Sequence, residues 1–282
     1  MKLWTTLRAG YDRRSQVALT LLGVLYLTVG LLWNTYINLS FGMDWLLGGI
    51  WVGMTALLCW RVDPWRDSVR AGVGFAGGLC IEAWGTYTLL WTYWTTERPP
   101  LWILPAWPVA ALAIDRLARM LDPVVPRRGV RLLYWTLLPG FVVWMTAFVW
   151  PTHLHPATQI AVAGMVLVVL LPGDRREDLL LFLAGTLLGV FLEYWGTSRH
   201  CWVYYTAEIP PAPAVVAHGF ASVAFARGAA GVDAVYGLVS TWRVRDAAGT
   251  RPSSTSARSA AHRTSGSADQ STDTASAARI ST

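Results

Sequence analysis

Charged residues are scarce in this sequence. Only 14% of its 282 residues are charged, whereas 54% are hydrophobic and the mean hydropathy is +0.39. Charged residues make up about a quarter of an average globular protein, so too few are present to cover the surface of a water-soluble fold. We therefore exclude an ordinary soluble domain and expect a protein whose solvent is the lipid bilayer.

Cysteine and lysine are also rare. Cys59, Cys80 and Cys201 are too few and too scattered for a disulfide framework or a thiolate metal site. Lys2 is the one lysine among 23 basic residues, a skew that indicates GC-rich, bacterial coding. The sequence has no glycine-rich phosphate loop, serine nucleophile elbow or His-Glu-x-x-His motif. We accordingly expect neither a metal nor a cofactor.

Long apolar runs dominate the rest of the chain. They cover residues 17–36, 45–60, 70–94, 101–115, 132–151, 157–172, 179–203 and 213–226. About 20 apolar residues in a helix cross a hydrocarbon layer of about 30 Å. The sequence therefore predicts an all-α, polytopic membrane helix bundle of about eight spans.

Basic residues lie in short clusters between these runs, and alternate loops carry most of them. The richer loops hold Arg61, Arg66, Arg70, Arg116, Arg119, Arg127, Arg128, Arg131, Arg175, Arg176, Arg227, Arg243 and Arg245, and the opposite loops hold Arg98 and Arg199. The positive-inside rule predicts a multi-pass plasma-membrane protein with both termini in the cytoplasm. The net charge of +6 therefore reflects topology, and no nucleic-acid partner is expected.

An internal repeat relates residues 74–106 to residues 185–217 at an offset of 111. The two segments share 13 identities in 33 positions. We predict two four-helix membrane repeats, 1–120 and 121–245, followed by a disordered cytoplasmic tail, 246–282, that is rich in Ala, Ser and Thr. Because each repeat has an even number of spans, the repeats are parallel and related by an axis along the membrane normal.

The repeated motif reads Gly-x3-Gly-x3-Glu-x-Trp-Gly-Thr-x4-Trp-x-Tyr-x5-Pro-Pro. On a continuous helix, the glycines, Glu82, Thr86 and Tyr93 would form one stripe, and Trp84 and Trp91 another. Small residues four apart allow close helix approach in lipid. We therefore expect the glycine stripe to face a neighbouring helix and to carry Glu82 inward, with the Pro-Pro pair ending the helix.

Glu82 and its counterpart Glu193 are the candidate catalytic residues. Glu82 follows Arg70 by 12 residues, or about 18 Å along a helix, which places both glutamates near the membrane midplane. Their own helices offer no cation at that depth, so we expect one or both to be neutral acids. The alternative is purely structural: a neutral carboxyl would bond Thr86, Thr197 or a neighbouring carbonyl and clamp two helices together.

Aromatic residues surround these acids in the motif. We take Trp84, Thr86, Tyr93, Trp195, Thr197 and Tyr204 as candidate substrate-binding residues. For Trp91, Trp94 and Trp202 we favour the aromatic belt at the outer interface. The spacing of His153, His155, His200 and His218 does not define a metal site. Asp63, Asp67, Asp174 and Asp178 are expected to start helices and to form surface ion pairs.

Two proton-holding carboxylates, 17 tryptophans and no nucleophile motif suggest protonation of a hydrophobic alkene, with aromatic faces stabilising the cation. Glu82 to Tyr93 and Glu193 to Tyr204 resemble the integral membrane hydratase family of carotenoid biosynthesis, in which a membrane Glu precedes a Gly and a Tyr-containing aromatic run. The resemblance implies an isoprenoid substrate and hydration or cyclisation. The alternatives are a proton-coupled transporter and a non-catalytic assembly protein; the oligomeric state stays open.

Overall fold

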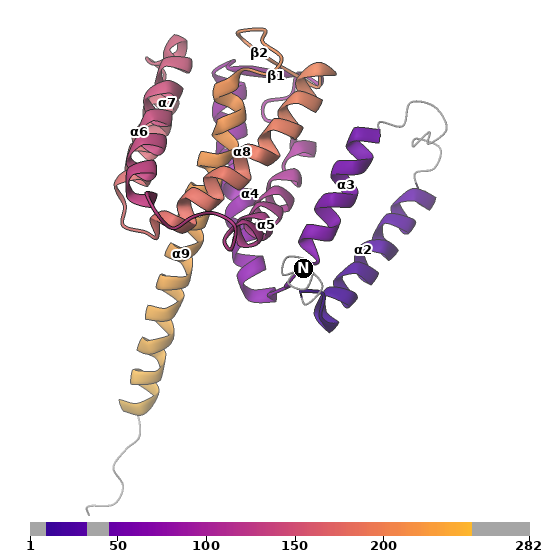
Figure 1. Ribbon diagram of the computed structural model, residues 1–282, viewed down its shortest axis with the longest axis vertical. Helices are drawn as coiled ribbons and strands as arrows, with labels where there is room; N and C mark the ends of the chain where they lie inside the picture. Colours follow the sequence, from indigo (N-terminus) through magenta and orange to yellow (C-terminus); the bar gives the residue numbers. More distant parts are fainter. Residues whose placement is uncertain (1–9, 33–44, 250–282) are drawn as a thin grey trace, which may run out of the picture. The chain divides into compact units, whose positions relative to one another are not determined.

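The computed structural model describes residues 10–32 and 45–249, and these residues are mostly helical. The elements in chain order are α2 (Arg13–Leu32), α3 (Trp45–Leu58), α4 (Pro64–Tyr87), β1 (Trp91–Tyr93), the 3-10 helix η1 (Leu101–Ile103), α5 (Ala106–Leu121), α6 (Val130–Phe148), the 3-10 helix η2 (Trp150–Thr152), α7 (Pro156–Leu170), α8 (Arg175–Ser198), β2 (Trp202–Tyr204) and α9 (Ala212–Gly249) (Figure 1). Each predicted apolar run overlaps one of these α-helices.

Four helical segments among the described residues are long and apolar enough to cross a membrane. They are Leu101–Leu121, Val130–Phe148, Arg175–Ser198 and Ala212–Ser240. Helices α3 and α7 have 14 and 15 residues, too short for about 30 Å of hydrocarbon at about 1.5 Å per residue. The predicted membrane character is thus supported by four helices, and the number of eight spans is not shown.

The described residues up to Val235 form one compact unit, and a second unit begins at Tyr236. Only the first unit concerns the site. Helix α9 continues through 246–249, where we expected the disordered tail to begin. The rest of that tail, residues 250–282, lies outside the described residues, as do Lys2 and Arg8.

Helices α4 and α8 are local copies of each other. Both have 24 residues, and both begin at an aspartate N-cap: the Asp63 side chain accepts from the Arg66 amide, and the Asp174 side chain accepts from the Arg176 and Glu177 amides. The expectation that these aspartates start helices is confirmed. An N-cap carboxylate satisfies amide groups that have no partner within the helix.

The glycine stripes pack as expected. A Cβ built at Gly74 or Gly78 would meet Ala111 or Trp107 of α5. In the second half, a Cβ at Gly185 or at Gly189 would meet backbone atoms of α9. Side-chain-free positions therefore let α4 approach α5 and let α8 approach α9, as small residues do between membrane helices.

A second duplicated contact ties the same helix pairs together. Arg116 donates to Asp67 at 2.5 Å, and 111 residues later Arg227 donates to Asp178 at 2.5 Å. The Arg116 side chain is 0% exposed and the Asp178 side chain 6%. The predicted ion pairs therefore form, but their predicted place at the surface was wrong: Arg116 and Asp178 are buried, and Asp67 and Arg227 are mostly covered.

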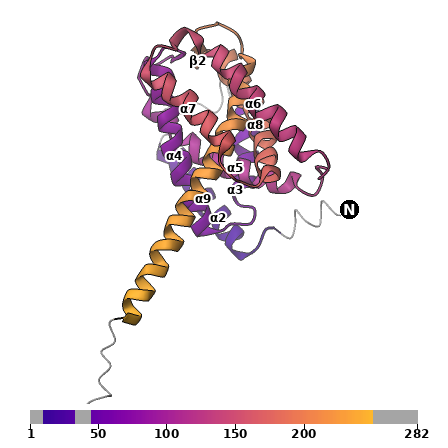
Figure 2. The same cartoon turned by 90° about the vertical axis from the view of Figure 1, so that its left-hand side faces the viewer.

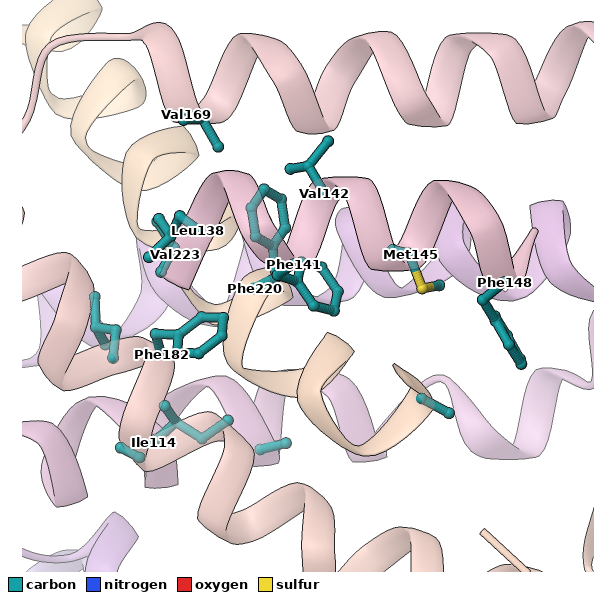
Figure 3. Packing of buried hydrophobic residues seen from close by; sticks show 14 of the residues in the cluster. Ile114, Leu138, Phe141, Val142, Met145, Phe148, Val169, Phe182, Phe220 and Val223 are labelled. Carbon is teal, nitrogen blue, oxygen red and sulfur yellow. The ribbon is translucent and has the colours of Figure 1, made fainter. Parts of the chain in front are cut away.

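The apolar core lies between α6, α8, α9 and α5. Phe141 of α6 stacks on Phe220 of α9 at a centroid distance of 5.1 Å and meets Phe182 of α8 edge-on at 6.1 Å (Figure 3). Large apolar side chains also point outward: Leu132, Val143 and Ile160 are 74%, 72% and 72% exposed. Such outward faces suit a lipid environment.

The all-α prediction omits one element, a two-stranded antiparallel sheet. Trp91 lies opposite Tyr204, Thr92 opposite Val203, and Tyr93 opposite Trp202. Both strands lie at one end of the helices of the compact unit (Figure 1), and the second view shows β2 at that end (Figure 2). The sheet joins the two halves of the sequence repeat directly.

Candidate functional site

The chain folds back on itself after each glutamate helix. Helix α4 ends at Tyr87, Leu89 adopts a left-handed conformation with φ of 60°, and β1 follows. In the second half α8 ends at Ser198, His200 has φ of 54°, and β2 follows. Our expectation of a continuous helix through Tyr93 was therefore wrong, because the left-handed residue turns the chain before the Trp-x-Tyr segment.

This turn brings the strand side chains back to Glu82. Trp91 Nε1 donates to Glu82 Oε2 at 3.1 Å, and the Tyr93 hydroxyl lies 3.0 Å from both carboxyl oxygens. From α5, Trp107 Nε1 donates to Oε1 at 3.1 Å. Glu82 is only 3% exposed, and three donors from two other elements surround its carboxyl group.

Glu193 has a related but different set of neighbours. Trp202 Nε1 donates to Oε2 at 2.9 Å, and the Tyr204 hydroxyl donates to Oε1 at 2.9 Å. His218 of α9 occupies the place of Trp107, with Nε2 3.8 Å from Oε1. Glu193 is 4% exposed, so its carboxyl group is equally buried but has an imidazole where Glu82 has an indole.

The tryptophan rings pack against the third glycine of each motif, the one that follows the Glu-x-Trp segment. A Cβ built at Gly85 would overlap the ring of Trp91, and one at Gly196 would overlap the ring of Trp202. Across the sheet, Trp91 contacts Tyr204 and Tyr93 contacts Trp202, each pair with centroids 5.9 Å apart. The two halves therefore interlock directly beside the two carboxyl groups.

Both glutamates line one cavity of about 1110 Å³. Its walls are mostly apolar and come from nearly every helix of the compact unit; they include Trp84, Trp195, Tyr93, Tyr204, Met145 and Phe225. Trp107 and His218 line it as well. Small-molecule sites usually enclose about 300–1,000 Å³ with few polar groups, so this cavity suits a large hydrophobic ligand.

The sequence-predicted binding residues divide into two groups. Trp84, Trp195, Tyr93 and Tyr204 border the cavity, whereas Thr86 and Thr197 are not among its described lining residues. The hydroxyls of these threonines donate at 2.6 Å to the backbone oxygens of Glu82 and Glu193. They therefore bond their own helices and not the carboxyl groups.

The aromatic-belt interpretation fails for two of its three tryptophans. Trp91 is 8% exposed and bonds Glu82, while Trp202 bonds Glu193. Trp94, in contrast, is 71% exposed. Trp84 donates to Thr158 of α7 at 3.0 Å and meets Trp91 edge-on, so it connects a neighbouring helix to the site.

We did not assign Trp107 and His218 to the site from the sequence. They are related by the same offset of 111, and their rings stack with centroids 6.1 Å apart and planes at 9°. The repeat shows that His218 stands where the first half has Trp107, but no sequence signal indicates that this position contacts the glutamates. Within the described residues, no group of three or more His, Cys, Asp or Glu is placed to hold a metal ion.

No protein-family model, curated protein or solved structure matches the chain.

Proposed function

We propose that this protein is an integral membrane enzyme that binds an isoprenoid or similar lipidic alkene and protonates it, with Glu82 or Glu193 as the acid. One observation carries the proposal: two buried carboxyl groups line a single large cavity whose other walls are mostly apolar. The resemblance of Glu82–Tyr93 and Glu193–Tyr204 to the carotenoid hydratases supports an isoprenoid as the substrate class.

The proposed topology is a multi-pass bundle of eight spans in the plasma membrane, built as a 4+4 parallel repeat with both termini in the cytoplasm. The duplicated N-caps, strands and Asp–Arg pairs at an offset of 111 support the repeat. This topology would place Glu82 and Glu193 at equal depth near the midplane. A lipid-soluble substrate could reach them there without leaving the bilayer.

The chemistry balances without a cofactor. The carboxyl proton adds to one alkene carbon by way of the π electron pair, and the other carbon becomes cationic. In hydration, water forms the new C–O bond and returns a proton to a carboxylate, so that alkene and water give an alcohol. In cyclisation, the π electron pair of a second double bond forms a C–C bond to the cation, the positive charge moves to the other carbon of that double bond, and a neighbouring carbon gives a proton to a carboxylate, which forms a new double bond and restores the acid. Ring faces such as those of Trp84 and Trp195 stabilise the cation.

Lipid extracts test the proposal. A strain that lacks the gene should accumulate an alkene precursor and lose the hydrated or cyclised product, and the wild-type gene should restore that product. Glu82→Gln and Glu193→Gln keep the side-chain shape but remove the exchangeable proton. Because general acid catalysis contributes about 10²–10⁴-fold, we expect the variant that replaces the acid to lower product formation by about that factor.

The motif offers matched controls in Glu97 and Glu208, which occupy equivalent positions in the two halves and are exposed. Glu97→Gln and Glu208→Gln should restore the product fully. Full activity of both Glu82→Gln and Glu193→Gln would end the acid-catalysis proposal. Unchanged lipids with altered proton-coupled uptake would favour a carrier, and no change in either would favour an assembly protein.

A further inference from the structure

The two carboxyl groups differ in what their neighbours can do with a proton. Around Glu82 the partners are two indole N–H groups and one phenol, from Trp91, Trp107 and Tyr93. An indole N–H donates and never accepts. Both oxygens of Glu82 therefore receive hydrogen bonds, an arrangement that is complementary to an ionised carboxylate.

Around Glu193 one indole is replaced by an imidazole, which can accept as well as donate. His218 Nδ1 lies 3.1 Å from the carbonyl oxygen of Ala214. A carbonyl oxygen only accepts, so Nδ1 carries a hydrogen. In the neutral ring, Nε2 then presents a lone pair to Glu193 Oε1, 3.8 Å away. A lone pair facing a carboxylate oxygen is repulsive unless one proton lies on either group.

The surroundings favour keeping that proton. The His218 ring stacks on Trp107 at 9°, and an aromatic face attracts an imidazolium by the cation–π interaction. Among the described residues, the other titratable groups that line the cavity are Glu82, Tyr93, Tyr204, Tyr87 and Cys80. Glu82 is held by its own three donors, so the proton on the neighbouring pair depends on Glu193 and His218 themselves.

We infer that Glu193 and His218 together hold the one exchangeable proton of the site, while Glu82 is a fixed carboxylate that stabilises the cation and receives the proton released later. This division of labour rests on the proposed function. In that reaction Glu193 is the acid that touches the substrate, and His218 is a positioning residue that keeps the acid loaded with a proton.

The test exchanges Trp107 and His218, the equivalent positions at which the neighbours of the two glutamates differ, and it needs no substrate. The full chain, reconstituted in phosphatidylcholine–phosphatidylglycerol nanodiscs, is measured from about pH 5 to about pH 8, where histidine titrates. Infrared spectroscopy detects the carbonyl stretch of a protonated carboxyl group, and ¹⁵N NMR detects an imidazolium ring. In the wild type we expect one of these two signals at neutral pH.

His218→Trp should abolish both signals, because the new indole can only donate to Glu193. His218→Gln, a smaller change, should do the same, and Glu82→Gln should leave the signal in place. Trp107→His should create a second proton site at Glu82. Each variant must elute as a single species, which separates a lost proton from a lost fold.

Persistence of the signal in both His218 variants, or its loss in Glu82→Gln, would overturn the inference. Failure of the proposed function looks different: the proton would be found as expected while the lipid extracts of the deletion strain stay unchanged.

Discussion

Replacing Gly85 by alanine should displace the Trp91 ring, which donates a hydrogen bond to Glu82. The new methyl group would overlap the six-membered ring of Trp91, and the indole would have to move away from the helix. Overpacking of this kind costs about 1–3 kcal/mol. The displaced indole would also lose its 3.1 Å bond to Glu82; with Glu82 ionised, as proposed above, such a hydrogen bond contributes about 1.5–3 kcal/mol.

Against these losses, alanine is favoured over glycine in a helix by about 1 kcal/mol. The net expectation is a loss of about 2–5 kcal/mol, a large part of the about 5–15 kcal/mol that stabilises a typical protein. Gly164→Ala is the matched control, since nothing lies within 4 Å of a Cβ at that helical glycine, and it should be neutral or slightly stabilising.

The assay is unfolding of the purified protein in mixed micelles as the fraction of denaturing detergent rises, followed by tryptophan fluorescence. The reasoning is refuted if Gly85→Ala unfolds at the same point as Gly164→Ala. A fluorescence spectrum unchanged by Gly85→Ala would also contradict the prediction, because the environment of Trp91 must change when its ring moves.

Two further predictions concern charges away from the cavity. Arg116→Met should lower the free energy of unfolding by about 3–5 kcal/mol, because it leaves Asp67 against a buried apolar side chain; adding Asp67→Leu should recover part of that loss in the same detergent titration. In the first turn of α2, the Ser15 backbone amide donates to Asp12, which precedes the helix, and lowers the pKa of that carboxyl. The stabilising effect of ionised Asp12 is therefore full above about pH 4 and is lost as the pH falls through the lower folded pKa. A ¹³C NMR titration of Asp12 measures that pKa. A titration midpoint at or above the ordinary value for aspartate would contradict the prediction.

The sequence was sufficient to predict the helices and the close packing of the glycine stripes, because both follow from apolar length and residue size. It was not sufficient to predict the path after Tyr87. We extended the helical period through Trp91 and Tyr93, although alternating aromatic residues followed by Pro-Pro also suit a short strand. The left-handed Leu89 that ends the helix carries no sequence signal of its own, since such a conformation is normally taken by glycine.

The extension of the helix through Trp91 and Tyr93 also explains the other errors at the site. With Trp91 on a helix, the interface was the natural place for it, and Thr86 was the natural partner for Glu82. The turn reverses both assignments, because a residue nine positions from Glu82 returns to bond it. Long-range contacts of this kind also brought His218 to Glu193, whereas we had looked for cations only on the two helices that carry the acids.

His218→Trp separates a structural role from a chemical one. If the glutamates only clamp helices, each is best served by a donor that bonds it directly, as Trp107 bonds Glu82 at 3.1 Å. His218 stands 3.8 Å from Glu193 and supplies a weaker contact, and Gly189 already provides beside it the small residue that Gly78 provides beside Trp107. We therefore expect His218→Trp to raise the free energy of unfolding by about 0.5–1.5 kcal/mol, the net value of one hydrogen bond, while product formation falls. A residue that is needed for activity is commonly less stabilising than the best alternative at its position. A variant that loses stability and activity together would show instead that the imidazole at this position serves the packing of α9 on α8.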